Sequence, residues 1–152
     1  MSTSISSLVV WAQSKITTIT PALATGPRPS AFVAASGLRS WENRPGADID
    51  REVTMAKGIV EEALTIGGTS DQLFQGTMVL TIGHSKMGAN ATGMARRDND
   101  IELICRKLMS PAEYTTDLCL LLKTGESIED REDFWITTVT FEVTYVGTAI
   151  GQ

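Results

Sequence analysis

The stretch DFWITTVTFEVTYV, residues 133–146, constrains the fold more than any other part of the sequence. Its side chains alternate between a mainly apolar set and a mainly polar set, which predicts a β-strand with one buried face and one solvated face. The first set is Trp135, Thr137, Val139, Phe141, Val143 and Tyr145, and the second is Ile136, Thr138, Thr140, Glu142 and Thr144. Such a strand is about 40 Å long, whereas strands in globular domains usually have about 5 to 6 residues. The sequence therefore predicts an unusually long sheet with a threonine-rich polar face.

Length and charge limit what this sheet belongs to. A chain of 152 residues fits one domain, residues 1–152, with a core that needs no disulfides or metals. The formal net charge of −5 argues against tight wrapping of nucleic acid, which requires a basic face. Cys105 and Cys119 lie in apolar stretches without CxxC spacing, so we expect both to be reduced and buried. The N-terminus has neither a signal-peptide nor a membrane-span pattern, which predicts a protein made in a cytosol.

Two segments have helical periodicity. Residues 4–20 place Ile5, Leu8, Val9, Ala12, Ile16 and Ile19 on one stripe, and the pattern stops before Pro21. The segment RRDNDIELICRKLM predicts a second amphipathic helix. Its apolar face is Ile101, Ile104, Cys105 and Leu108, and Asn99 with Glu102 has the spacing of a capping pair.

The remaining apolar segments predict strands. Residues 54–68 fit either a helix or a strand, and we favour a strand because GTMVLTIGHS, residues 76–85, alternates and could pair with it through a hairpin at Gly67 and Gly68. After the second helix, LCLLL predicts a buried strand and KTGESIEDRED a polar connection to the closing strand. The order helix, hairpin, helix, hairpin predicts an α+β fold, a mainly antiparallel sheet with two amphipathic helices packed on one face.

Residues 21–50 differ from the rest, because they hold four of the five prolines and only one short apolar run, AFVAAS, that could be a strand. We expect a long surface excursion, and long ordered loops are usually functional. It carries Arg39, Trp41 and Arg44, a combination typical of interface anchors. Packing of Trp41 onto the core, with the arginines solvated, is the alternative.

No pattern in the sequence indicates catalysis. His84 is the single histidine, and it lies in GHSKM, where a nucleophile turn would need a glycine in place of Met87 and a separate base for Ser85. We therefore expect His84 to be a hydrogen-bonded surface residue at a strand end. One histidine and two separated cysteines are too few for a zinc site, and the sequence has neither a calcium-loop pattern nor a phosphate-binding glycine motif. The expectation is a protein that is not an enzyme and binds no cofactor or metal.

The chain resembles the tail-terminator family of long-tailed phages, the minor tail protein U type, in the order of its elements. The resemblance is carried by the helix DIELICRKLM, the run TTDLCLLL, the acidic turn GESIEDRED and the closing WITTVTFEVTYV. The strand GTMVLTIGHS and the opening amphipathic helix also stand in the family's order. The likeness spans most of the chain, but it contains no invariant chemical motif. Residues 37–58, approximately, form a longer loop excursion than the family has.

The resemblance implies a structural virion protein of the tail or neck, assembled in the host cytoplasm. It implies a homo-oligomer, a hexameric ring, that caps the tail tube, stops its polymerisation and joins the tail to a head-side connector or stopper protein. In that family the sheets line a channel through which double-stranded DNA passes without specific binding, and no membrane is involved.

On this hypothesis, a neighbouring subunit would complete the backbone hydrogen bonds of the over-long closing strand. The residues that would face the channel are Thr138, Thr140, Glu142 and Thr144. Contacts to subunits or partners would come from Arg39, Trp41, Arg44, Glu126, Glu129 and Asp130. Two alternatives stay open, another phage neck component such as a head-completion or stopper protein, and a small α+β ligand-binding domain with a polar pocket.

Overall fold

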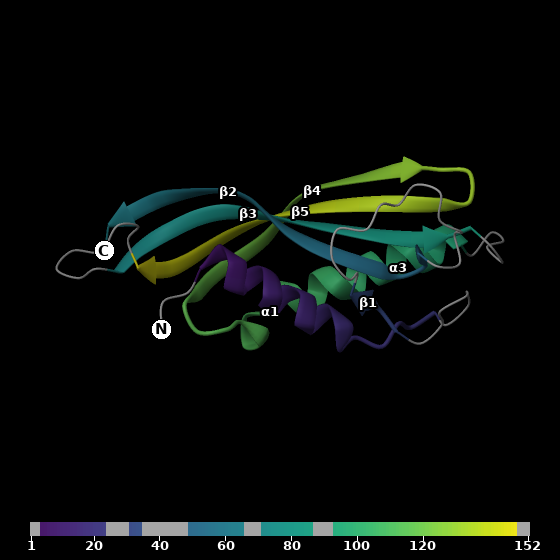
Figure 1. Ribbon diagram of the computed structural model, residues 1–152. Coiled ribbons are helices and arrows are strands. Elements are labelled where there is room, and N and C mark those ends of the chain that lie inside the picture. The colour runs from purple at the N-terminus through teal and green to yellow at the C-terminus, as the bar shows by residue number, and fades with distance from the viewer. Residues whose placement is uncertain (1–3, 24–30, 35–48, 66–70, 87–92, 149–152) are drawn as a thin grey trace.

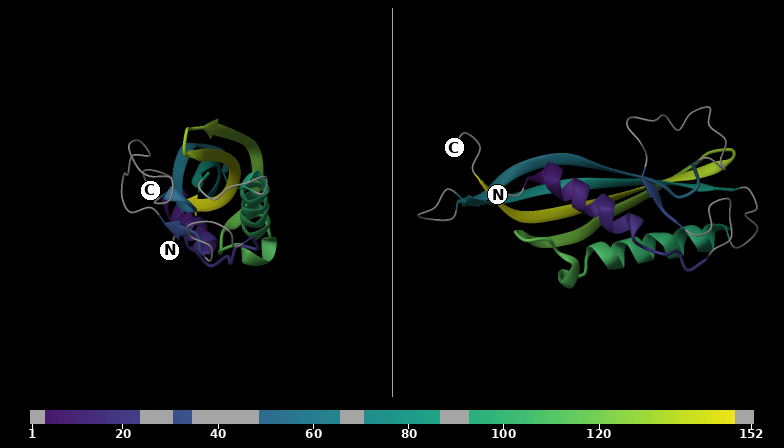
Figure 2. Two further views of the ribbon diagram at one scale, coloured as in Figure 1. Left: turned by 90° about the vertical axis from the view of Figure 1, so that its right-hand side faces the viewer. Right: turned by 60° about the horizontal axis from the view of Figure 1, so that its bottom comes forward.

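Five strands form one sheet in the computed structural model, which describes residues 4–23, 31–34, 49–65, 71–86 and 93–148. The strands are β1 (Val33–Ala34), β2 (Glu52–Thr65), β3 (Asp71–Ser85), β4 (Leu118–Asp130) and β5 (Phe134–Thr148), in the order β1-β2-β3-β5-β4. The short β1 pairs parallel with the start of β2, and every other pair is antiparallel. The sheet is long and strongly twisted (Figures 1 and 2).

Two helices, α1 (Ile5–Thr17) and α3 (Gly93–Leu108), lie on the same face of this sheet (Figure 1), and a 3₁₀ turn, η1 (Pro111–Glu113), follows α3. The predicted α+β fold is therefore confirmed. α1 begins at Ser4, whose side chain accepts a hydrogen bond from the Ser7 N–H at 3.2 Å. α3 begins six residues before Asn99, so the predicted capping pair of Asn99 and Glu102 is wrong.

The core lies between the helices and one face of the sheet. Val139, Phe141 and Val143 of β5 are fully buried on this face, as the alternation predicts. Cross-strand neighbours complete the layer, with Met78 opposite Phe141 and Leu80 opposite Val139. The helix side chains that close it are Ile5, Leu8, Ala12, Ile16, Ile101, Ile104, Cys105 and Leu108. Both predicted helical stripes are thus confirmed.

The closing strand is internal, and this corrects the reason given for its length. β5 pairs with β3 from Phe134 to Thr148 and with β4 from Trp135 to Tyr145. Its backbone groups consequently have partners within the chain on both sides, and no neighbouring subunit is required. The strand is long because all four main strands are long, at 13 to 15 residues each.

The start of β5 departs from the predicted pattern. Ile136 is 6 % exposed although it lies on the polar face, because Ile49 covers it together with Phe134 in a second apolar cluster. The prediction that residues 21–50 form a surface excursion is therefore wrong at its end, where Ile49 and Asp50 are buried. Residues 52–58, placed in the loop insertion, belong to β2. The prediction of a strand for residues 54–68 is confirmed over its described part.

Strand β4 corrects two further predictions. It is an edge strand, so Leu118 and Leu121 are buried while Leu120 and Leu122 are exposed, and LCLLL is not a fully buried strand. The predicted polar connection instead continues the strand to Asp130, and only residues 131–133 form the turn. Cys119 is exposed, contrary to the expectation that both cysteines are buried, and both are free thiols as expected.

Gly58 is required by close packing across a bulge in β2. The register shifts between Lys57 and Val60, and a Cβ atom at position 58 would overlap the Thr77 hydroxyl and lie 3.2 Å from Thr77 Cβ. We expect Gly58→Ala to lower the free energy of unfolding by about 1 to 3 kcal/mol, and Thr77→Ala to relieve most of that loss. Gly125→Ala is the matched control at the β4 bulge, because no atom lies within 4 Å of the added Cβ. Equal losses for the two glycines in urea unfolding would contradict this account.

Candidate assembly surface

The sheet face opposite the helices carries one row of hydroxyl side chains and, beside it, a row of mostly small apolar side chains. The cross-strand register places Thr54, Thr81, Thr138 and Ser127 in one row across β2, β3, β5 and β4. The next row contains Ala56, Val79, Thr140 and Gly125. Neither α1 nor α3 lies on this face (Figure 2). These two rows, with the further rows that contain Glu142 and Thr144, are called the hydroxyl face. The face crosses four strands, whereas the sequence indicated it for one strand only.

The four residues predicted to face a channel, Thr138, Thr140, Glu142 and Thr144, all lie on the hydroxyl face and are partly buried. Glu142 accepts a hydrogen bond from the Gln75 side chain of β3. On β4 the neighbours of this part of the face are apolar, since Leu122 is opposite Glu142 and Leu120 is opposite Thr144.

The predicted acidic contact residues lie along β4 and not in a connecting turn. Glu129 forms an ion pair with Arg131 at 2.6 Å, and Asp130 pairs with Lys86, the residue that follows β3. Their carboxyl side chains remain 55 % and 72 % exposed. Arg39, Trp41 and Arg44 lie outside the described residues.

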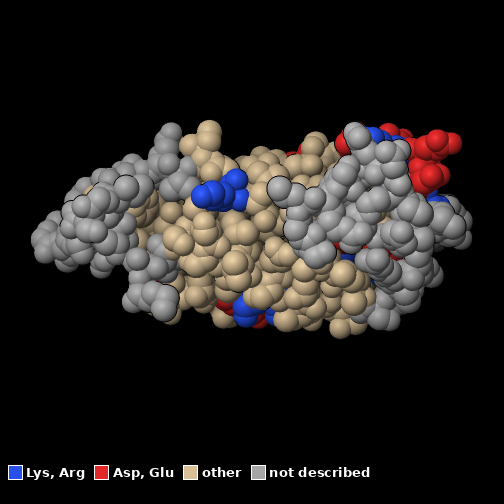
Figure 3. Space-filling view, in the orientation of Figure 1, with Lys and Arg blue, Asp and Glu red and all other residues tan. Residues whose placement is uncertain are grey.

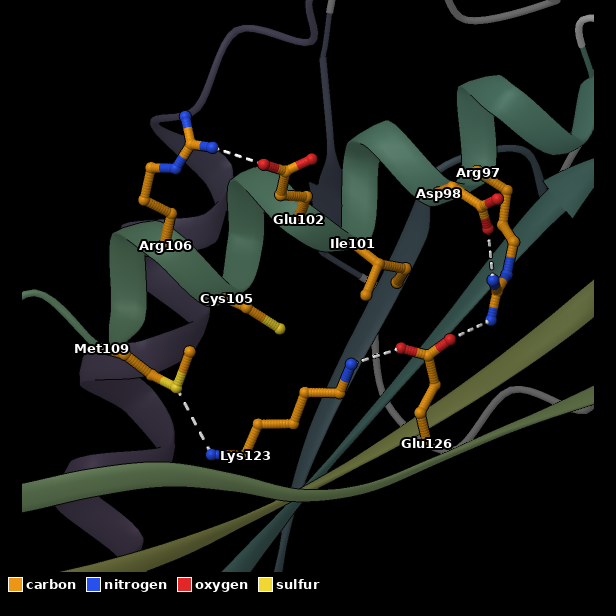
Figure 4. Close-up of a pocket in the computed structure, with 9 residues that line it drawn as sticks. All are labelled: Arg97, Asp98, Ile101, Glu102, Cys105, Arg106, Met109, Lys123 and Glu126. Carbon is orange, nitrogen blue, oxygen red and sulfur yellow. Dashed lines mark hydrogen bonds and ion pairs between the residues drawn. The ribbon is translucent and has the colours of Figure 1, made fainter.

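Glu126 belongs to a groove between α3 and β4 of about 550 Å³ (Figure 4). Its carboxylate accepts hydrogen bonds from Lys123 Nζ at 2.6 Å and from Arg97 Nη2 at 2.7 Å. These bonds, that from Lys123 above all, lower the pKa of Glu126 below its ordinary value of 4.5, so the carboxyl group is ionised at neutral pH.

Apolar side chains from α3 line the same groove, namely Ile101, Cys105 and Met109. Burial raises the pKa of the Cys105 thiol, which leaves it protonated and a poor nucleophile at neutral pH. The groove can therefore bind apolar or peptide-like groups, but its paired charges and neutral thiol do not form a nucleophilic site.

A buried charge network joins the sheet to α3 beside this groove. Arg51, just before β2, donates to both carboxylate oxygens of Asp100, with Nε at 2.7 Å and Nη2 at 3.0 Å. His84 Nε2 lies 2.8 Å from the same carboxylate. A second pair, Arg96 with Asp50, has N···O distances of 2.9 and 3.0 Å. All five side chains are buried, so each charge depends on its partner.

This network corrects the prediction that His84 is a surface residue, because His84 is fully buried. Sequence reasoning missed it, although a signal was present. Arg96, Asp100 and Ile104 are spaced four residues apart, so the two charged residues lie on the same side of α3 as the apolar Ile104. Charged residues on a buried stripe require partners from other elements, and here these come from the ends of β2 and β3.

No group of three or more His, Cys, Asp or Glu side chains among the described residues is placed to hold a metal ion. No described helix has the length and apolar character needed to cross a membrane. Comparison with protein-family models and with curated proteins finds no match to this chain.

Proposed function

We propose that the protein is a structural subunit of a phage tail, a tail terminator whose hexameric ring caps the tail tube and joins it to the head-side connector. The observation that carries this proposal is the hydroxyl face, the sheet surface opposite both helices, on which Thr138, Thr140, Glu142 and Thr144 of β5 lie. Small hydroxyl groups and a carboxylate offer DNA phosphates no cationic partner. A ring with this face inward, and with α1 and α3 outward, would give DNA a channel in which it slides without binding.

The proposed ring assigns roles to the remaining surfaces. Glu126, Glu129 and Asp130 on edge strand β4, with the segment that contains Arg39, Trp41 and Arg44, would contact neighbouring subunits, the tube protein or the connector. The protein would be part of the virion tail or neck after assembly in the host cytoplasm. Another neck component, such as a stopper protein, would share these surfaces and differ in partner and symmetry.

Native mass spectrometry over a range of concentrations tests the ring. We expect a species at six times the 16.4-kDa chain mass, populated more strongly as concentration rises. A chain that stays monomeric both alone and on purified tail tubes would contradict the proposal. Rings of another order that bind a head connector but no tubes would instead identify a different neck component.

Glu142→Lys tests the channel. In a ring, the substitution turns a line of carboxylates into a line of ammonium groups that attract phosphate, so DNA passage should slow while assembly is preserved. We expect double-stranded DNA to be retained by rings of the variant at low salt and released as salt rises, with no retention by wild-type rings. Glu142→Gln is the neutral control, and it should resemble the wild type. Normal DNA ejection from virions that carry Glu142→Lys would contradict the assignment of the hydroxyl face to the channel.

A second candidate function, a small ligand-binding domain, is favoured by the groove between α3 and β4. Its volume lies in the range of small-molecule sites, and polar groups of Arg97, Lys123 and Glu126 converge beside an apolar floor. Thermal-shift screening of small molecules separates the candidates. A ligand that stabilises the wild type but not Cys105→Phe, which fills the groove, would favour this second function.

A further inference from the structure

The outer edge of β4 is divided into a covered half and an open half. In the covered half, the Leu121 N–H donates to Tyr114 Oη at 3.1 Å, and the Lys123 N–H donates to Met109 Sδ at 3.3 Å. From Gly125 to Asp130, the backbone hydrogen bonds to described residues are those of the ladder with β5. An edge of about six residues is long enough to accept one added strand.

The open half borders the groove below α3. Glu126, Ile128 and Asp130 lie on the face of β4 that α3 flanks, and Ile128 is 42 % exposed there. Alternate side chains of a strand added at this edge would point toward the groove, where Ile101 and Cys105 supply apolar surface. The edge thus offers hydrogen bonds along the backbone and an apolar site for every second side chain.

Carboxylates outnumber cations along this edge and its turn. Residues 125–133 contain Glu126, Glu129, Asp130, Glu132 and Asp133. Their cationic partners are Arg97 and Lys123 for Glu126, Arg131 for Glu129 and Lys86 for Asp130, and the side chains of Glu129 and Asp130 stay more than half exposed. Figure 3 shows acidic side chains gathered at the end of the molecule where β4 turns into β5. Acidic side chains repel an identical edge, so they disfavour pairing of β4 with β4 of a second copy. The complementary partner is an extended segment with basic side chains.

We infer that the open half of β4, Gly125–Asp130, is a docking edge for a basic, extended segment of a different protein, which adds to the sheet as a further strand. Apolar residues at alternate positions of that segment would enter the groove beside Ile101 and Cys105. Its lysines or arginines would point to the opposite face, where Glu129 lies. The inference goes beyond the proposed ring and does not depend on it.

Capped heptapeptides of alternating lysine and valine, or glutamate and valine, test the docking edge on the full-length protein. We expect the lysine peptide to bind at least about tenfold more tightly at low salt, a difference of about 1.4 kcal/mol. Hydrogen exchange followed by mass spectrometry should show slower exchange confined to the peptic fragment that contains residues 125–130. The double variant Glu129→Lys, Asp130→Lys should reduce binding by at least about tenfold, whereas Lys57→Glu on β2 should leave it unchanged.

Three results would overturn the inference. The first is equal binding of the two peptides, and the second is protection that falls on β2 or α1 instead of residues 125–130. The third is protection of residues 125–130 that rises with protein concentration in the absence of peptide, which would identify a second copy as the occupant. Unfolding midpoints of the lysine-substituted protein and of Lys57→Glu, measured beside the wild type, establish that any loss of binding is not a loss of fold.

Discussion

Asp100→Asn should lower the free energy of unfolding by about 3 to 5 kcal/mol, a large part of the total stability of a domain of this size. The carboxylate of Asp100 is fully buried and accepts two hydrogen bonds from Arg51, besides its contact with His84. An amide removes the negative charge that Asp100 places against the buried guanidinium of Arg51. Because α3 meets β2 and β3 at this point, the loss should appear in the cooperative unfolding of the whole domain, measured by urea denaturation.

Glu102→Gln is the matched control, two residues further along α3. Glu102 pairs with Arg106 one helical turn away, and both side chains are more than half exposed, at 62 % and 69 %. Loss of that exposed pair should cost less than about 0.5 kcal/mol. A double-mutant cycle with Arg51→Met isolates the pairwise term, and we expect the double variant to be more stable than the sum of the single losses predicts. Similar small losses for Asp100→Asn and Glu102→Gln would contradict the network's role.

Phe141→Ala should also cost about 3 to 5 kcal/mol, because it removes a large, fully buried side chain from the centre of the core. Phe141 lies between Met78 of β3 and Lys123 of β4 in the sheet register, below the helices. Truncation leaves a cavity that the long, hydrogen-bonded strands on both sides of β5 cannot close by moving together. Urea unfolding with an unchanged m-value measures the loss.

Thr140→Ala is the control for the opposite face, on the adjacent residue of the same strand. Its side chain points to the hydroxyl face, so we expect a change within about 0.5 kcal/mol. The pair therefore tests the assignment of the two faces directly. A loss for Thr140→Ala comparable to that for Phe141→Ala would mean that the hydroxyl face is packed against another part of the protein, and the channel proposal would lose its basis.

The elements of the fold could be predicted from the sequence because their signals are local. The alternation of Val139, Phe141 and Val143 fixes which face of β5 is buried, and the stripe of Leu8, Ala12 and Ile16 fixes the buried face of α1. The same alternation placed Thr138, Thr140, Glu142 and Thr144 on the polar face. Period-two and period-3.6 patterns report burial directly, since each residue's face follows from its position alone.

The sequence by itself thus determined the fold class and the buried faces of α1, α3 and the central part of β5. Only the tertiary structure decided the order of strands, and with it that β5 is internal and β4 is an edge with an acidic open half. It also brought Arg51, His84 and Asp100 together from three elements. Strand order and buried ion pairs depend on contacts between distant segments, and no local periodicity encodes which distant segment becomes a neighbour.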